Sequence, residues 1–140
     1  MDKPKVIVLC GSTRFYNEFQ AVNYELTMQG YIVLSVGFYL HSQDKAHGQE
    51  IGCTKEQKIM LDELHMRKID LADEIFVINQ HGYIGDSTKK EIEYSRSWGL
   101  PFRWYCTQRI SPGHTNKRDP IGIKVDEMMR KARMKNEELD

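Results

Sequence analysis

The 140-residue sequence lacks an excess of charge of either sign, since 20 basic and 20 acidic residues give a formal net charge of zero. Nothing in this balance would draw the protein to a nucleic acid or to an anionic membrane. The sequence also lacks an apolar run long enough to span a membrane, and no basic segment followed by a long apolar stretch opens it. We therefore expect a soluble, unprocessed protein with no membrane partner.

Cysteine is scarce. Cys10, Cys53 and Cys106 are widely spaced and form no CxxC pair. This pattern favours free thiols and a reducing, cytoplasmic location over a disulfide framework. Cys10 ends an apolar run, and at such a position a cysteine is more often a small core residue than a nucleophile.

A long polar segment, residues 37–54, holds five possible metal ligands at three-residue spacing: His41, Asp44, His47, Glu50 and Cys53. The spacing would gather them on one face of a helix. Interrupting glycines disfavour a continuous helix, and the set matches no established zinc pattern. We expect no metal ion and no cofactor, and we interpret this segment as a functional loop beside a binding pocket.

Short apolar runs alternate with segments of helical period along most of the chain. Strands are predicted at residues 6–10, 31–36, 74–79 and 102–106, with helices after Arg14, over 55–71, up to Trp98 and over 123–135. Such alternation predicts an α/β fold, a doubly wound, flavodoxin-like or Rossmann-like parallel sheet of four or five strands with a C-terminal helical tail.

The expected α/β domain covers residues 1–108, and residues 109–140 form a basic C-terminal extension. Eight Lys or Arg against three Asp or Glu lie between residues 109 and 135. The extension is either part of the same domain or partly disordered. No aromatic platform or recognised motif accompanies its charge, so we do not expect it to bind nucleic acid.

The turn after the first predicted strand, Gly11-Ser12-Thr13-Arg14, is a candidate phosphate site. Gly11 would let the backbone approach a ligand, Ser12 and Thr13 offer hydroxyl and N–H groups, and Arg14 offers a planar fork suited to phosphate. An N-capped helix with an exposed arginine explains the same residues.

A second candidate site follows the third predicted strand, in the stretch Gly82 to Ser95, GYIGDSTKKEIEYS. Gly85, Ser87 and Thr88 lie where a helix should begin, and a helix start favours bound anions and an ionised Glu91. The alternative is a capping box, in which Glu91 merely accepts a hydrogen bond from the backbone N–H of Thr88. Because the carboxyl ends of parallel strands share one sheet edge, we expect the two turns to be neighbours.

His65 interrupts an apolar stripe on the helix that precedes the third strand, and Asp62 lies one turn away. A histidine there either satisfies a core hydrogen bond or takes part in proton transfer. Asp62 would then orient His65 or point to solvent.

Three motifs together, GSTR, LHMRKIDLADEIFVI and GDSTKKEIEYS, resemble the nucleoside 2-deoxyribosyltransferase superfamily over residues 5–106. Within it, the pattern is similar to small 2′-deoxynucleoside 5′-phosphate N-hydrolases. The resemblance implies cleavage or transfer at the N-glycosidic bond of a nucleoside or nucleotide, with Glu91 as nucleophile and Ser12, Arg14 and Ser87 as phosphate contacts. It also implies a homodimer or higher homo-oligomer.

The sequence departs from the family at two places. His65 stands where the family generally has an aspartate, and Val8 where it often has a tyrosine. The departures leave open a different substrate, or a non-catalytic module that binds or senses nucleotides.

Overall fold

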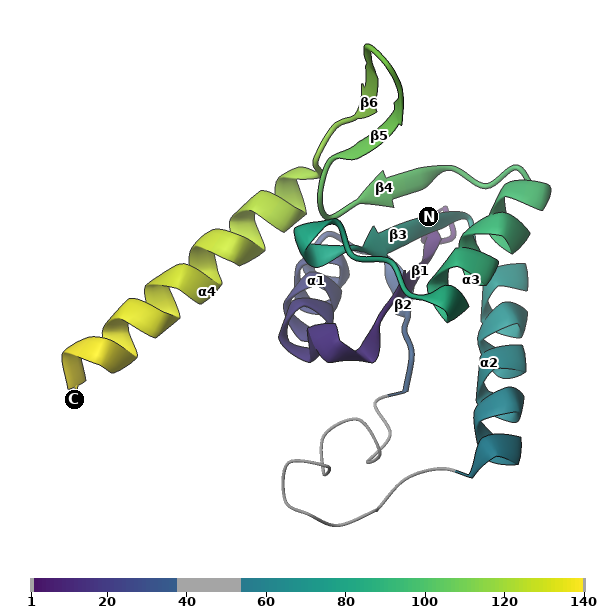
Figure 1. Cartoon of the computed structure of the whole chain (residues 1–140), viewed down its shortest axis with the longest axis horizontal. Helices are drawn as coiled ribbons and strands as arrows, with labels where there is room; N and C mark the ends of the chain where they lie inside the picture. The colour runs from purple at the N-terminus through teal and green to yellow at the C-terminus, as the bar shows by residue number, and fades with distance from the viewer. Residues whose placement is uncertain (1, 38–53, 140) are drawn as a thin grey trace.

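The computed structural model describes residues 2–37 and 54–139. The elements in chain order are β1 (Val6–Gly11), η1 (Thr13–Phe15), α1 (Tyr16–Met28), β2 (Ile32–Leu34), α2 (Lys55–Asp70), β3 (Glu74–Ile78), η4 (Gln80–Gly82), α3 (Asp86–Ser97), β4 (Phe102–Trp104), β5 (Gln108–Ser111), β6 (His114–Asn116) and α4 (Pro120–Leu139) (Figure 1). The possible metal ligands from His41 to Cys53 lie outside the described residues.

Four strands form one parallel sheet in the order β2-β1-β3-β4. Val8 pairs with Leu34 of β2 on one side and with Ile75 of β3 on the other. The chain thus winds outward from β1 in both directions, and the prediction of a doubly wound α/β fold is confirmed. Strand order reverses between β1 and β3, and ligands of such sheets bind beyond the carboxyl ends of the strands at this reversal.

Alternation along β1 divides its side chains between two apolar layers. Ile7 and Leu9 pack with α1 and α4, whereas Val8 and Cys10 pack with α2 and α3. A strand buried on both faces needs apolar side chains at successive positions, as this run has. The layer against α2 and α3 further includes Ile69, Ile75, Val77, Ile92 and Trp104.

Gly11, at the end of β1, is required by strand packing. A Cβ atom there would lie 2.6 Å from the backbone oxygen of Ile78 and 3.2 Å from the ring of Phe19. The glycine therefore permits close approach of β3 and α1, a role that the sequence alone did not suggest.

The C-terminal extension holds two structures that differ from the prediction. Residues 108–116, where no strand was predicted, form the antiparallel hairpin β5–β6, with Gly113 supplying a positive φ of 82° between the strands. Helix α4 begins at Pro120, three residues before the predicted start, and buries Ile121 and Val125 in the layer against α1. Its distal end extends away from the sheet (Figure 1).

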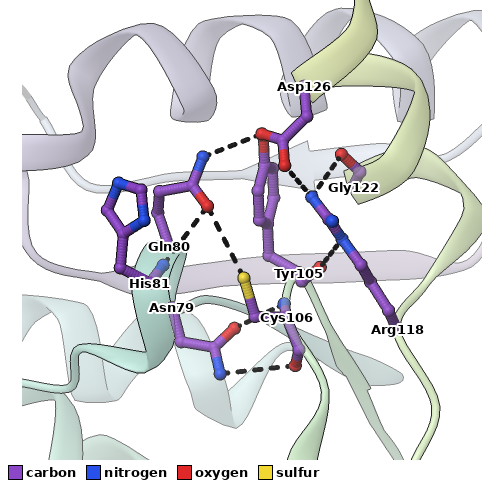
Figure 2. Close-up of polar contacts among 8 residues, drawn as sticks. All are labelled: Asn79, Gln80, His81, Tyr105, Cys106, Arg118, Gly122 and Asp126. Carbon is purple, nitrogen blue, oxygen red and sulfur yellow. Dashed lines mark hydrogen bonds and ion pairs between the residues drawn. The ribbon is translucent and has the colours of Figure 1, made fainter.

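Asp126 joins α4 to the carboxyl ends of β3 and β4 (Figure 2). Its carboxylate accepts hydrogen bonds from Gln80 Nε2 at 2.8 Å and from the Tyr105 hydroxyl at 2.5 Å, and it pairs with Arg118. Arg118 also donates to the backbone oxygens of Tyr105 and Gly122. The polar network fixes the first turns of α4 on the sheet.

Among the described residues, no helix is both long enough and apolar enough to cross a membrane.

Candidate functional site

A pocket of about 200 Å³ opens beyond the carboxyl ends of the strands, at the reversal point of the sheet. The two predicted turns meet there, as expected. Its lining includes nine predicted site residues: Gly11, Ser12, Thr13, Asp62, His65, Gly85, Ser87, Thr88 and Glu91. Of the predicted set, Arg14 alone is outside this lining.

Helix α3 starts earlier than the capping-box interpretation requires. Its N-cap is Gly85, which provides no side-chain cap, and the backbone N–H of Lys89 donates to the oxygen of Gly85. Glu91 is therefore in the second turn, and the capping-box alternative is wrong. A capping box is present instead at the start of α2, where Thr54 and Gln57 exchange hydrogen bonds of 3.1 and 2.8 Å.

Glu91 belongs to a buried cluster of three chemically active side chains, together with Cys10 and His65. Cys10 Sγ lies 3.5 Å from His65 Nε2, and His65 Nε2 lies 3.9 Å from Glu91 Oε2. All three side chains are buried, and Glu91 Oε2 has no hydrogen-bond partner among the described residues. Strand β1, helix α2 and helix α3 thus each contribute one reactive group to the inner end of the pocket.

Burial decides the protonation of this cluster. Loss of hydration raises the pKa of Glu91 to about 8, and nearby Asp62 acts in the same direction. Burial lowers the pKa of His65 to about 4, with Lys68 adding to the effect. The expectation that the helix start keeps Glu91 ionised is therefore wrong for the ligand-free pocket at neutral pH. Burial is the main reason, and Glu91 also lies in the second turn, beyond the region where the helix dipole is strong.

Two lysines line the same pocket. Lys58 Nζ lies 2.9 Å from Asp62 Oδ2 and 3.4 Å from Ser87 Oγ, so Asp62 pairs with a lysine instead of His65. Lys68 Nζ donates to the backbone oxygen of Ser35 at 2.7 Å. These cations could meet an anionic group of a ligand.

Arg14 has a different environment from the one predicted. Its guanidinium lies over the ring of Tyr83, 3.8 Å from the centroid, and donates to the Tyr83 hydroxyl at 3.1 Å. Ser12 accepts a hydrogen bond of 3.3 Å from the backbone N–H of Arg14 and caps η1. This turn therefore matches the second interpretation given above, an N-capped helix with an exposed arginine.

Sequence reasoning missed Lys58 and Lys68 and discounted Cys10. A signal for the lysines was present, because positions 58, 61, 62, 65 and 68 share one helical face. The signal for Cys10 was its alternation with Val8, which places both on the α2 side of the sheet. Only packing of α2 and α3 against that side brings the thiol to His65.

No family model and no curated protein matches the chain. Among solved structures, the chain is similar to a 2-desoxiribosyltransferase from Leishmania mexicana, with a TM-score of 0.48 and 16% sequence identity. The likeness covers 75% of this chain and 67% of that one. A likeness of this degree carries no conclusion about a reaction.

Proposed function

We propose that the protein cleaves or transfers at the N-glycosidic bond of a nucleoside or nucleoside 5′-monophosphate, with Glu91 as nucleophile. One observation carries the proposal: a buried carboxyl, 3.9 Å from an imidazole, at the inner end of a pocket rimmed by hydroxyls and lysines. A carboxylate next to an anomeric carbon is the arrangement that retaining glycosidases use.

The reaction begins with a proton transfer, because Glu91 must be ionised to attack. His65 Nε2 is the neighbouring base, and an imidazolium beside a carboxylate stabilises both charges in a buried site. A Glu91 oxygen then forms a bond to the anomeric carbon while the bond from that carbon to the base nitrogen breaks. The leaving base takes the proton from His65 directly or through one water.

The second half of the reaction restores the enzyme. Water, or the nitrogen of a second base, attacks the anomeric carbon, and the bond to Glu91 breaks. His65 accepts the proton that the attacking group loses, and Glu91 recovers a proton when the product leaves. Hydrolysis and transfer therefore differ only in the group that attacks the anomeric carbon in this second half, which is water in one case and a base nitrogen in the other.

The phosphate of a nucleotide would lie toward the start of α3. The first-turn residues Asp86, Ser87 and Thr88 line the pocket, and Lys58 Nζ is 3.4 Å from the hydroxyl of Ser87. The free N–H groups of a helix start favour a bound anion. We assign the phosphate to this side instead of Arg14, because Arg14 is engaged by Tyr83.

The test offers deoxynucleosides, ribonucleosides and their 5′-phosphates to the purified protein and follows free base by chromatography. Thermal unfolding with each compound reports binding independently of turnover. We expect base release from at least one compound by the wild type and none by Glu91→Gln.

A non-catalytic nucleotide-binding module is the second candidate, favoured by one observation. Burial keeps Glu91 protonated at neutral pH, with a pKa of about 8, and a protonated carboxyl can donate a hydrogen bond to a base without attacking a sugar. If a compound raises the melting temperature but none is cleaved between pH 6 and pH 9, this second function replaces the first.

A further inference from the structure

The geometry points to a binding site for a divalent transition metal of the Zn²⁺ class, formed by Cys10 Sγ, His65 Nε2 and a Glu91 carboxylate oxygen. This inference goes beyond the proposed function and does not depend on it. The three ligand atoms all lie within 4.8 Å of one another, and they come from β1, α2 and α3.

The distances suit a small ion. Bonds of about 2.3 Å to sulfur and about 2.0 Å to nitrogen or oxygen in a tetrahedron place ligand atoms about 3.3 to 3.5 Å apart. The sulfur of Cys10 is 3.5 Å from His65 Nε2, which is 3.9 Å from Glu91 Oε2. The third pair, Cys10 Sγ and the Glu91 oxygen, lies within 4.8 Å, so the Glu91 carboxyl would move toward the ion on binding.

The ligand types also suit this class of ion. Sulfur and imidazole select Zn²⁺ and related ions over Mg²⁺ or Ca²⁺, which prefer an all-oxygen set. Glu91 Oε2 is buried without a hydrogen-bond partner among the described residues, and a buried polar atom of this kind calls for an explanation. A bound cation would supply the missing partner.

The fourth coordination position would face the pocket, because His65 and Glu91 line it. Three protein ligands with one open position are the pattern of sites that bind water or a ligand group. Of the two lysines in the lining, Lys58 is paired with Asp62, which offsets its charge near the ion.

Metal binding and the nucleophilic role of Glu91 exclude each other, since both use its carboxylate. Zn²⁺ should therefore inhibit base release, if the protein catalyses it, and a chelator should restore it. The binding itself is measured without substrate, and base release is measured with the metal chelated, so either proposal can fail alone.

The direct test titrates chelator-treated protein with Co²⁺ and follows thiolate-to-cobalt charge-transfer absorption. We expect one ion per chain, a band lost in Cys10→Ser and a band kept in Cys106→Ser, the matched control at a thiol that contacts Gln80. No band in the folded wild type would overturn the site, and so would a band that persists in Cys10→Ser.

A second variant covers the case in which Cys10→Ser does not fold. Glu91→Gln should keep the thiolate band but bind Co²⁺ about tenfold more weakly or worse, as loss of a metal contact requires. Zn²⁺ should likewise raise the melting temperature of the wild type more than that of Glu91→Gln. Equal Co²⁺ affinity in the two proteins would overturn the site.

Discussion

His65 Nε2 lies 3.9 Å from Glu91 Oε2, yet the two side chains do not form an ion pair at neutral pH. Burial moves the pKa of His65 down to about 4 and that of Glu91 up to about 8. A neutral imidazole therefore faces a protonated carboxyl. Any reaction in the pocket therefore starts from two uncharged side chains.

The activity of the protein should depend on pH through Glu91. If Glu91 passes its proton to His65 and His65 gives it to the leaving base, the free protein must hold this proton, so kcat/KM should fall as pH increases through about 8. The measurement is base release at low substrate concentration from pH 6 to pH 9.5. A profile that rises over this interval would mean that Glu91 attacks after losing its proton to solvent and that His65 does not protonate the leaving base.

Replacing the nucleophile should separate chemistry from folding. We expect Glu91→Gln to lower turnover on the order of a thousandfold or more, since loss of a nucleophile removes the covalent route. Stability below about pH 4.5 should change little, because there the amide replaces a carboxyl that is uncharged in both the folded and the unfolded protein. Glu93→Gln is the matched control on an exposed position of the same helix, and it should keep full turnover.

The same pair of variants tests the protonation state through stability. The folded protein keeps a proton on Glu91 that the unfolded chain releases near its usual pKa of 4.5. The stability from this group is thus complete below about pH 4.5 and is lost as pH rises through about 8. His65 acts oppositely, with stability present above pH 6.5 and lost as pH falls through about 4.

Between pH 6.5 and pH 9 the contribution of His65 to stability is constant, so of these two groups only Glu91 makes stability change with pH. Measured by urea unfolding, the free energy of unfolding of Glu91→Gln should increase relative to that of the wild type as pH rises across this interval. Glu93→Gln should follow the wild type. If both variants run parallel to the wild type, Glu91 is ionised in the folded protein at pH 6.5.

Two cations compete for the role of phosphate contact, and substitution distinguishes them. Lys58→Gln should weaken binding of a 5′-monophosphate by about tenfold and leave the nucleoside affinity nearly unchanged, because the lysine lies 3.4 Å from Ser87 Oγ in the pocket. Arg14→Ala should have less effect, since Arg14 contacts Tyr83. Calorimetry on both variants checks this, and a larger loss in Arg14→Ala would return the phosphate to the GSTR turn.

Asp126 should stabilise the docking of α4 through its three hydrogen-bond donors. Although burial opposes ionisation, hydrogen bonds from Tyr105 and Arg118 lower the pKa of Asp126 below its usual value. Asp126→Ala leaves three donors without their acceptor and should reduce the free energy of unfolding by about 1–3 kcal/mol. Glu127→Ala, which breaks only an exposed pair with Lys131, should change it by less than about 1 kcal/mol.

Local patterns in the sequence predicted the elements that build the sheet. Successive apolar residues in Val6–Cys10 indicated a strand buried on both faces, and the spacing of Phe15, Phe19, Val22 and Leu26 indicated the helix behind it. The parallel sheet then required the turns after β1 and β3 to meet at one edge. These features depend on residues close in sequence, so the sequence by itself determined them and the location of the pocket.

Only the tertiary structure decided which side chains act together. Cys10, His65 and Glu91 are 26 to 81 positions apart, and their contact depends on how α2 and α3 pack on one face of the sheet. The same packing removes water from Glu91 and His65 and sets their pKa values, and it leaves Arg14 over Tyr83. Dehydration and contacts between distant segments have no local sequence pattern, which is why the chemistry of the pocket could not be predicted from the motifs that located it.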